Sequence, residues 1–96
     1  MTKYETLFVL NPTLDEENTK SNIEKIKGVI EQGGGTVTNV DEWGKRRLAY
    51  EVKDFTEGYY VLINFEANSD LPKELDRIFR ISDPVIRHLI VNLDER

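Results

Sequence analysis

The 96-residue sequence has no cysteine, only three prolines, one histidine and one tryptophan. Without cysteine there can be no disulfide, thiolate nucleophile or cysteine-ligated metal, which suits a reducing cytosol. No apolar run is long enough to cross a membrane, and the first residues lack the cationic and apolar pattern of a secretory signal. We therefore expect a cytoplasmic protein with no membrane partner.

The sequence also lacks the residue patterns of common active sites. His88 is the only histidine, and a lone histidine by itself indicates neither a Ser–His–Asp triad nor a convincing zinc site. Gly33–Gly35 is not followed by the Lys-Ser or Lys-Thr of a phosphate-binding loop. Residues 11–14 contain neither glycine nor arginine, unlike the catalytic loop of acylphosphatases, which share the predicted element order. We predict no catalytic residue, metal, cofactor or small-molecule substrate.

The charge balance is acidic. Eighteen Asp and Glu against thirteen Lys and Arg give a net charge of −5 at pH 7. Non-specific binding to nucleic acid depends on many Lys and Arg contacts with phosphates, so this charge opposes it. If the protein contacts RNA, it must use a local basic patch or act beside a more basic partner.

The residue patterns predict one α+β domain spanning residues 1–96. Hydrophobic residues make up 39% and charged residues 32%, a balance typical of compact proteins. Strand patterns cover residues 3–10, 36–52, 59–65 and 85–93, with a turn at 53–58. Helical apolar spacing follows residue 13 and residue 69. The order βαββαβ indicates a ferredoxin-like fold, a four-stranded antiparallel sheet with two helices on one face.

Local signals predict where both helices begin and where the first one ends. Thr13 lies three residues before Glu16, the spacing of a capping box. The stretch Ser69-Asp70-Leu71-Pro72 offers a capping side chain and an early proline for the second helix. The glycine triplet 33–35 should end the first helix.

Period-two alternation predicts which side chains lie on the sheet face that the helices leave open. On the third strand, Tyr59, Val61, Ile63 and Phe65 should face the helices, while Tyr60 and Leu62 face away. We expect neighbouring apolar side chains on the open face at Leu7, Val9, Leu62, Leu89 and Val91. An exposed apolar patch of this kind indicates a partner surface.

The densest positive charge is Lys45-Arg46-Arg47, at the centre of the longest predicted strand. A basic run on a strand can serve only to keep the sheet edge soluble. Composition alone favours that interpretation.

The residues around this run resemble a known signature. The segment from Trp43 to Tyr50, followed by Gly58-Tyr59-Tyr60, is similar to the signature of the bacterial small-ribosomal-subunit protein six family. Tyr4-Glu5, Asn11-Pro12 and residues 85–87 occur at matching places. The resemblance covers about residues 3–91.

This resemblance implies a structural constituent of the small ribosomal subunit. Family members bind the central domain of the ribosomal RNA together with small-subunit protein eighteen, a basic partner, and aid assembly. The implied RNA contacts are Lys3, Tyr4, Lys45, Arg46, Arg47, Lys53 and Arg87. The candidate contacts with protein eighteen are Tyr60, Leu62, Leu89 and Val91. One departure is Glu51, which stands where many members have proline.

An alternative is an RNA-recognition-motif-like domain, which binds single-stranded RNA on a sheet of the same topology. Residues 7–11 and 58–61 superficially match its two strand motifs. Glu57 stands where Lys or Arg should precede the glycine, and Glu5 and Glu66 would repel RNA from this face. A small-molecule or self-association module would need a polar pocket at the sheet edge, and no residue pattern indicates one.

Overall fold

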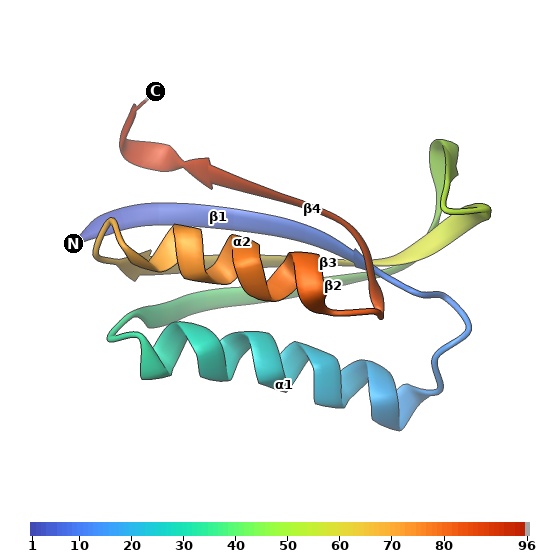
Figure 1. Ribbon diagram of the computed structural model, residues 1–96, viewed down its shortest axis with the longest axis horizontal. Coiled ribbons are helices and arrows are strands. Elements are labelled where there is room, and N and C mark those ends of the chain that lie inside the picture. The colour runs from blue at the N-terminus through green and yellow to red at the C-terminus, as the bar shows by residue number, and fades with distance from the viewer. Residues whose placement is uncertain (96) are drawn as a thin grey trace.

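The computed structural model describes residues 1–95 and has the predicted order of elements (Figure 1). The elements are β1 (Thr2–Leu10), α1 (Glu16–Gln32), β2 (Thr36–Val52), β3 (Phe55–Ala67), α2 (Leu71–Ile81), β4 (Val85–Asn92) and a 3-10 turn at Leu93–Glu95. The strands form one antiparallel sheet in the order β2-β3-β1-β4. Both helices lie on the same side of this sheet. The predicted ferredoxin-like α+β fold is confirmed.

The main core lies between the sheet and the two helices. Alternate side chains of β1 and β3 enter it, including Phe8 and Ile63, both fully buried. Helix α1 contributes Ile23, Ile26 and Ile30, as their helical spacing predicted. The ring of Phe8 lies 5.1 Å from that of Phe79 on α2, measured between centroids. Burial of these apolar groups is the main force that fixes the helices on this face.

The start of α1 differs from the capping-box prediction. Asp15 is the capping residue, and its Oδ1 accepts a hydrogen bond of 2.7 Å from the backbone N–H of Asn18. Thr13 lies two residues before this cap, where its N–H and hydroxyl both donate to Asn11 Oδ1. The Asn side chain closes a local turn with Thr13, which leaves the threonine unable to cap the helix. At the other end Gly34 adopts φ +85°, as a glycine after a helix often does.

The start of α2 also corrects the prediction. Pro72 occupies the second helical position, where the absence of its N–H costs nothing. Asp70 precedes the helix with helical backbone angles, and its side chain makes no capping hydrogen bond. A capping side chain needs an extended backbone to reach back to the first free N–H groups, so Asp70 cannot fill that role here.

The β2–β3 hairpin closes with a tighter turn than the predicted one at 53–58. Lys53 and Asp54 form the turn alone, with φ of 50° and 68°, and β3 begins at Phe55. Two positive φ angles are typical of the two-residue turn whose twist matches antiparallel strands. The apolar and aromatic residues from Phe55 onward therefore belong to the strand.

The far end of this hairpin bends away from the helices. Regular pairing stops after Arg47 and Glu57, so residues 48–51 lie opposite residue 56 alone before Val52 pairs with Phe55. Extra residues on one strand bend a hairpin and increase its twist. Figure 1 shows this bent tip, residues 48–56, turned upward at the end of the sheet opposite the chain termini. Leu48 in the tip packs with Val9 and Ile86 in a second, smaller core.

None of the helices described within residues 1–95 is long and apolar enough to cross a membrane.

His88 joins β4 to α2. Its Nε2 lies 2.6 Å from Asp76 Oδ1, and its ring stacks on Phe79 with 4.9 Å between centroids. Asp76 also accepts a 2.8 Å hydrogen bond from Arg80 Nε. The hydrogen bond from His88, with a smaller contribution from Arg80, lowers the pKa of Asp76 below its ordinary value of 3.8. The lone histidine thus has a structural position beside the core.

The two sheet faces should respond differently to the loss of a side chain. Ile63→Ala removes a fully buried group and should lower the free energy of unfolding by about 2–5 kcal/mol. Leu62→Ala, next to it on the open face, should cost less than about 1 kcal/mol. Urea unfolding of both variants measures the difference. Equal losses would show that the open face is packed in the isolated protein.

The Asp76 contact predicts a dependence of stability on acidity. Because the pKa of Asp76 is lower in the folded protein, its contribution is present above about pH 4 and disappears as pH falls through the folded value. Wild-type protein should therefore lose stability over this range more steeply than Asp76→Asn. Urea midpoints between pH 2 and pH 6 test this, and parallel curves for the two proteins would contradict it.

Candidate nucleic-acid and protein interface

The sheet face away from the helices carries a row of leucines. Leu7 pairs with Leu62 of β3 on one side and with Leu89 of β4 on the other. Leu89 is 58% exposed, a high fraction for a large apolar side chain. The predicted alternation of β1, β3 and β4 agrees with this register, so these three expected neighbours lie together. Val9, also expected on the exposed face, is instead buried (3% exposed) with Leu48 and Ile86 beneath the bent tip, and Val91 lies opposite Glu5. We call the row Leu7, Leu62 and Leu89 the leucine row.

The side of the leucine row nearer the chain termini carries carboxylate and amide side chains. Glu5 pairs with Asn64 and Val91, and Asn64 Nδ2 donates to Glu5 Oε2 at 3.3 Å. Asn39 Nδ2 donates to Asn64 Oδ1, also at 3.3 Å, which continues the chain of amides onto β2. Asp41 lies opposite Leu62. This zone, Glu5, Asn39, Asp41, Asn64 and Glu66, is called the acidic zone.

On the other side of the leucine row, aromatic rings lie against arginines. Tyr60 stacks on Trp43 with 6.0 Å between centroids and 9° between planes. The guanidinium of Arg46 lies 5.7 Å from the Trp43 ring centre, and that of Arg87 lies 5.8 Å from the Tyr50 ring centre. Contacts between an arginine and an aromatic face are worth about 0.5–1 kcal/mol each at exposed sites.

The backbone explains why Trp43 reaches Tyr60. Regular pairing is interrupted between Glu42 and Gly44, so Trp43 lies in a bulge of β2. Gly44 follows with φ +82°, a conformation that favours glycine. The indole Nε1 donates to Asp41 Oδ2 at 3.1 Å, which fixes the orientation of the ring. A bulge thus places an aromatic side chain where simple alternation would not.

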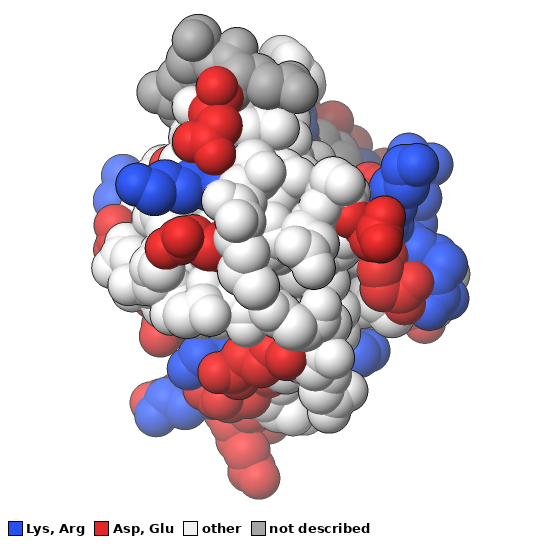
Figure 2. Space-filling view, turned by 90° about the vertical axis from the view of Figure 1, so that its left-hand side faces the viewer, with Lys and Arg blue, Asp and Glu red and all other residues white. Residues whose placement is uncertain are grey.

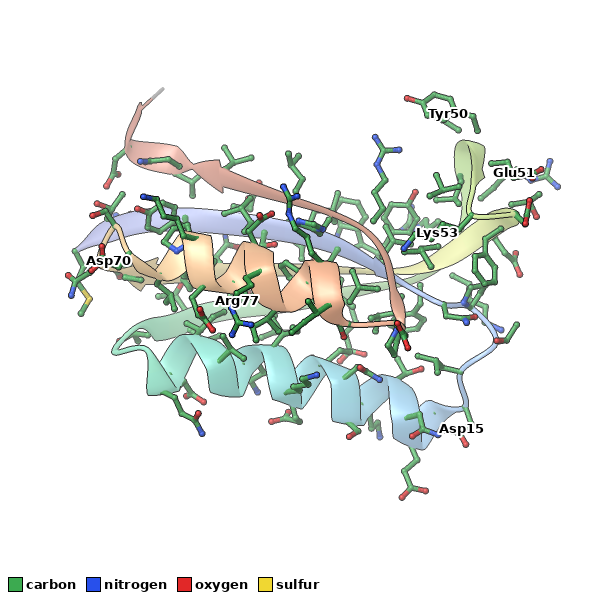
Figure 3. The ribbon with its side chains drawn as sticks, viewed as in Figure 1. Asp15, Tyr50, Glu51, Lys53, Asp70 and Arg77 are labelled. Atoms are coloured by element: carbon green, nitrogen blue, oxygen red, sulfur yellow. The ribbon has the colours of Figure 1, made fainter. Side chains whose placement is uncertain are left out.

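Four of the predicted RNA contacts lie at or beside this end of the sheet: Arg46, Arg47, Lys53 and Arg87. Arg46 and Arg87 are held against aromatic rings, and Lys53 is in the hairpin turn. Tyr50, Glu51 and Lys53 all come from the bent tip (Figure 3). Arg47 lies opposite Glu57, on the other side of the hairpin from Arg46. We call Trp43, Arg46, Tyr50, Lys53, Tyr60 and Arg87 the cationic zone.

Lys45 lies on the helix side. It pairs with Tyr59, and the two border a hollow beside α1 that is also lined by Glu16 and Glu42. The Tyr59 hydroxyl donates to Glu42 Oε1 at 2.8 Å, and this hydrogen bond raises the pKa of Tyr59 above its ordinary value. The basic run 45–47 is therefore divided between two faces and is not one patch.

Two predicted RNA contacts lie apart from the cationic zone. Tyr4 is 5% exposed, and its ring stacks on Phe65 in the core, so a base or phosphate could reach little of it. Burial on the helix side thus argues against the direct contact expected of Tyr4. Lys3 pairs with Glu66, about 20 Å along β1 from the position of Arg87, given about 3.3 Å per residue. In Figure 2, which views the end near the termini, acidic and basic side chains are interspersed around uncharged surface.

Sequence reasoning missed Trp43 and Tyr50 as members of this surface. A single tryptophan beside a basic run was a usable signal for the first. No signal in the sequence showed that Tyr50 would contact Arg87, because that contact depends on the bend at residues 48–51.

Among residues 1–95, no three or more His, Asp and Glu side chains are grouped so that they could hold a metal ion.

Comparison with known proteins gives the family. The family model described as ribosomal protein S6 matches residues 3–92. A small ribosomal subunit protein bS6 from Clostridium beijerinckii is 70% identical over 92 residues, which cover 96% of this chain and 97% of that protein. The bS6 protein of Clostridium botulinum (strain Hall) is 70% identical over 91 residues, which cover 95% of this chain and 97% of that protein. The crystal structure of 30S ribosomal protein S6 from Thermotoga maritima matches with a TM-score of 0.93 at 30% identity, covering 98% of this chain and 89% of that one. The chain therefore belongs to the ribosomal protein S6 family.

Proposed function

We propose that this chain binds the central domain of the small-subunit ribosomal RNA as a heterodimer with small-subunit protein eighteen, and so aids assembly. Membership of the S6 family already assigns it to the small ribosomal subunit in the cytoplasm, and this family is one of structural proteins, not of enzymes. We further propose that residues 1–96 act as one domain without catalytic activity. The observation that supports the RNA and partner roles is the sorting of the open face into an acidic zone, a leucine row and a cationic zone.

The acidic zone and the leucine row suit a basic protein. Leu89 and its neighbours offer apolar surface whose burial would stabilise a contact. Glu5, Asp41 and Glu66 lie beside this surface and would attract lysines and arginines of a partner. The same carboxylates would repel RNA phosphates. A basic protein therefore fits this part of the face better than RNA does.

The cationic zone suits the phosphate backbone. Guanidinium groups form paired hydrogen bonds with phosphate oxygens, and Arg46 and Arg87 are already oriented by aromatic rings. Contacts with phosphates would position the complex without reading base identity. We therefore propose Arg46, Arg87 and Lys53 as RNA contacts, while the geometry gives less support to Lys45 on the helix side and to the buried Tyr4.

One observation favours the alternative of base stacking on the open sheet. Trp43 is 38% exposed and lies parallel to Tyr60, an arrangement on which an unpaired base could stack. Phe8 and Tyr59, which match the RNA-recognition-motif positions in sequence, lie on the helix side. The alternative therefore depends on different rings from those that the motif predicts.

The contribution of the partner can be measured by omitting it. This chain alone should bind the central-domain RNA weakly at moderate salt, because its net charge is −5, and the pair with protein eighteen should bind tightly. Titrations of the RNA with each protein and with the pair compare the affinities. If the isolated chain bound as tightly as the pair, direct base stacking would replace heterodimer binding as the better explanation.

Salt dependence separates phosphate contacts from other basic residues. Arg46→Gln and Arg87→Gln should each reduce the slope of log affinity against log salt by roughly 0.7–0.9 for the pair on RNA. Arg47→Gln, on the other side of the hairpin, should leave the slope unchanged. Arg77→Gln on α2 is the matched control, since it removes the same charge from the helix layer (Figure 3). An unchanged slope in both Arg46→Gln and Arg87→Gln would remove the cationic zone from the RNA surface.

A further inference from the structure

A hollow of about 290 Å³ lies between the leucine row and the cationic zone. Its lining comes from β1, β3 and β4: Leu7, Val9, Tyr60, Arg87, His88 and Leu89. Three of these six residues are aliphatic, Tyr60 adds a phenol ring and Arg87 a guanidinium, while the ring of His88 bonds Asp76 on α2. Leu62, the third member of the leucine row, does not line it.

The groups that line this hollow are fixed by contacts outside it. Tyr60 stacks on Trp43, whose indole N–H donates to Asp41. Arg87 lies over the ring of Tyr50, which belongs to the bent tip. Val9 is 3% exposed and packs with the tip through the second core. A site whose side chains are already ordered loses little conformational entropy when it is filled.

We propose that this hollow receives a single aromatic side chain of the basic protein that pairs with the sheet. This inference rests on the proposed function and specifies one anchor point within it. At about 290 Å³ the hollow lies at the lower end of the roughly 300–1,000 Å³ typical of small-molecule sites, and it has room for one side chain. Tyr60 favours an aromatic occupant through ring–ring contact, and Arg87 favours one through its charge. Such buried anchors usually contribute most of the affinity of an interface.

The charges around the hollow support a protein occupant with basic neighbours. Glu5 lies on the side toward the chain termini, where a lysine or arginine next to the anchor would meet it, while Asp41 lies level with Leu62 and accepts from Trp43. Arg87 lies on the opposite side, where it would repel a further cation. The anchor should therefore have its basic neighbours on one side only, which sets the direction of the bound segment.

Filling the hollow without adding charge tests the proposal. Leu7→Phe places a ring inside the hollow and should weaken binding to purified protein eighteen at least tenfold. Ile81→Phe is the control: it adds a ring at a 64% exposed position of α2, away from the open sheet face, and should change affinity less than threefold. Leu89→Phe repeats the test from β4, and because Leu89 is 58% exposed we expect the larger side chain to leave the core intact.

Trp43 gives an independent readout. It is the only tryptophan of the chain, and it stacks on a ring that lines the hollow. Selective labelling of its indole nitrogen should show a shift of the Nε1–H resonance when protein eighteen binds the wild type. The Ile81→Phe complex should show the same shift, and Leu89→Phe should show little shift at equal partner concentration.

The outcomes distinguish this proposal from the one on which it rests. If wild-type protein does not bind protein eighteen, the proposed heterodimer fails, and the anchor fails with it. If it binds, and each filled variant binds as well as the control, the heterodimer stands and the anchor is overturned. Loss of affinity in Leu7→Phe and Leu89→Phe alone supports the anchor.

Discussion

The structure depends on a sheet that has helices on one face only. The two helices occupy one side of four antiparallel strands, and the core between them takes alternate side chains of β1 and β3. An antiparallel sheet can leave its second face in water provided that the residues there are mixed in polarity. Here that face keeps a leucine row at its centre, which is more apolar than solubility alone would require. The arrangement of the fold thus leaves one surface available for contact.

The sequence predicted this two-sided arrangement because it depends on periodicity. A shift of one residue in a strand would bury Glu5 or Asn64 and expose Phe8 or Ile63, so the pattern allows one orientation. The stripe Ile23, Ile26 and Ile30 likewise allows one orientation of α1. Helix starts were harder to predict, because Asn11 bonds Thr13 in a local turn and leaves the cap to Asp15. Competing short-range hydrogen bonds of similar strength decide such boundaries.

The site was predicted less well because it depends on departures from regular pairing. Alternation correctly placed Tyr60, Leu62 and Leu89 on the open face. It did not place Trp43, which a bulge directs onto Tyr60, or Tyr50, which the bend at residues 48–51 carries to Arg87. The basic run appeared continuous in the sequence, yet period-two geometry separates Arg46 from its two neighbours. Bulges insert residues without a marked composition, so their positions are not apparent in a single sequence.

The sorting of charge along the strands explains how an acidic chain could take part in an RNA complex. With a net charge of −5, the whole chain repels a polyanion, and screening at physiological salt limits this repulsion to about 8 Å. Arg87 and Arg46 lie at one end of the open face, and the acidic zone begins beyond the leucine row. A basic protein over the acidic zone would neutralise the nearest carboxylates and leave the arginines exposed. Protein and RNA contacts would then reinforce each other, because the first removes the charge that opposes the second.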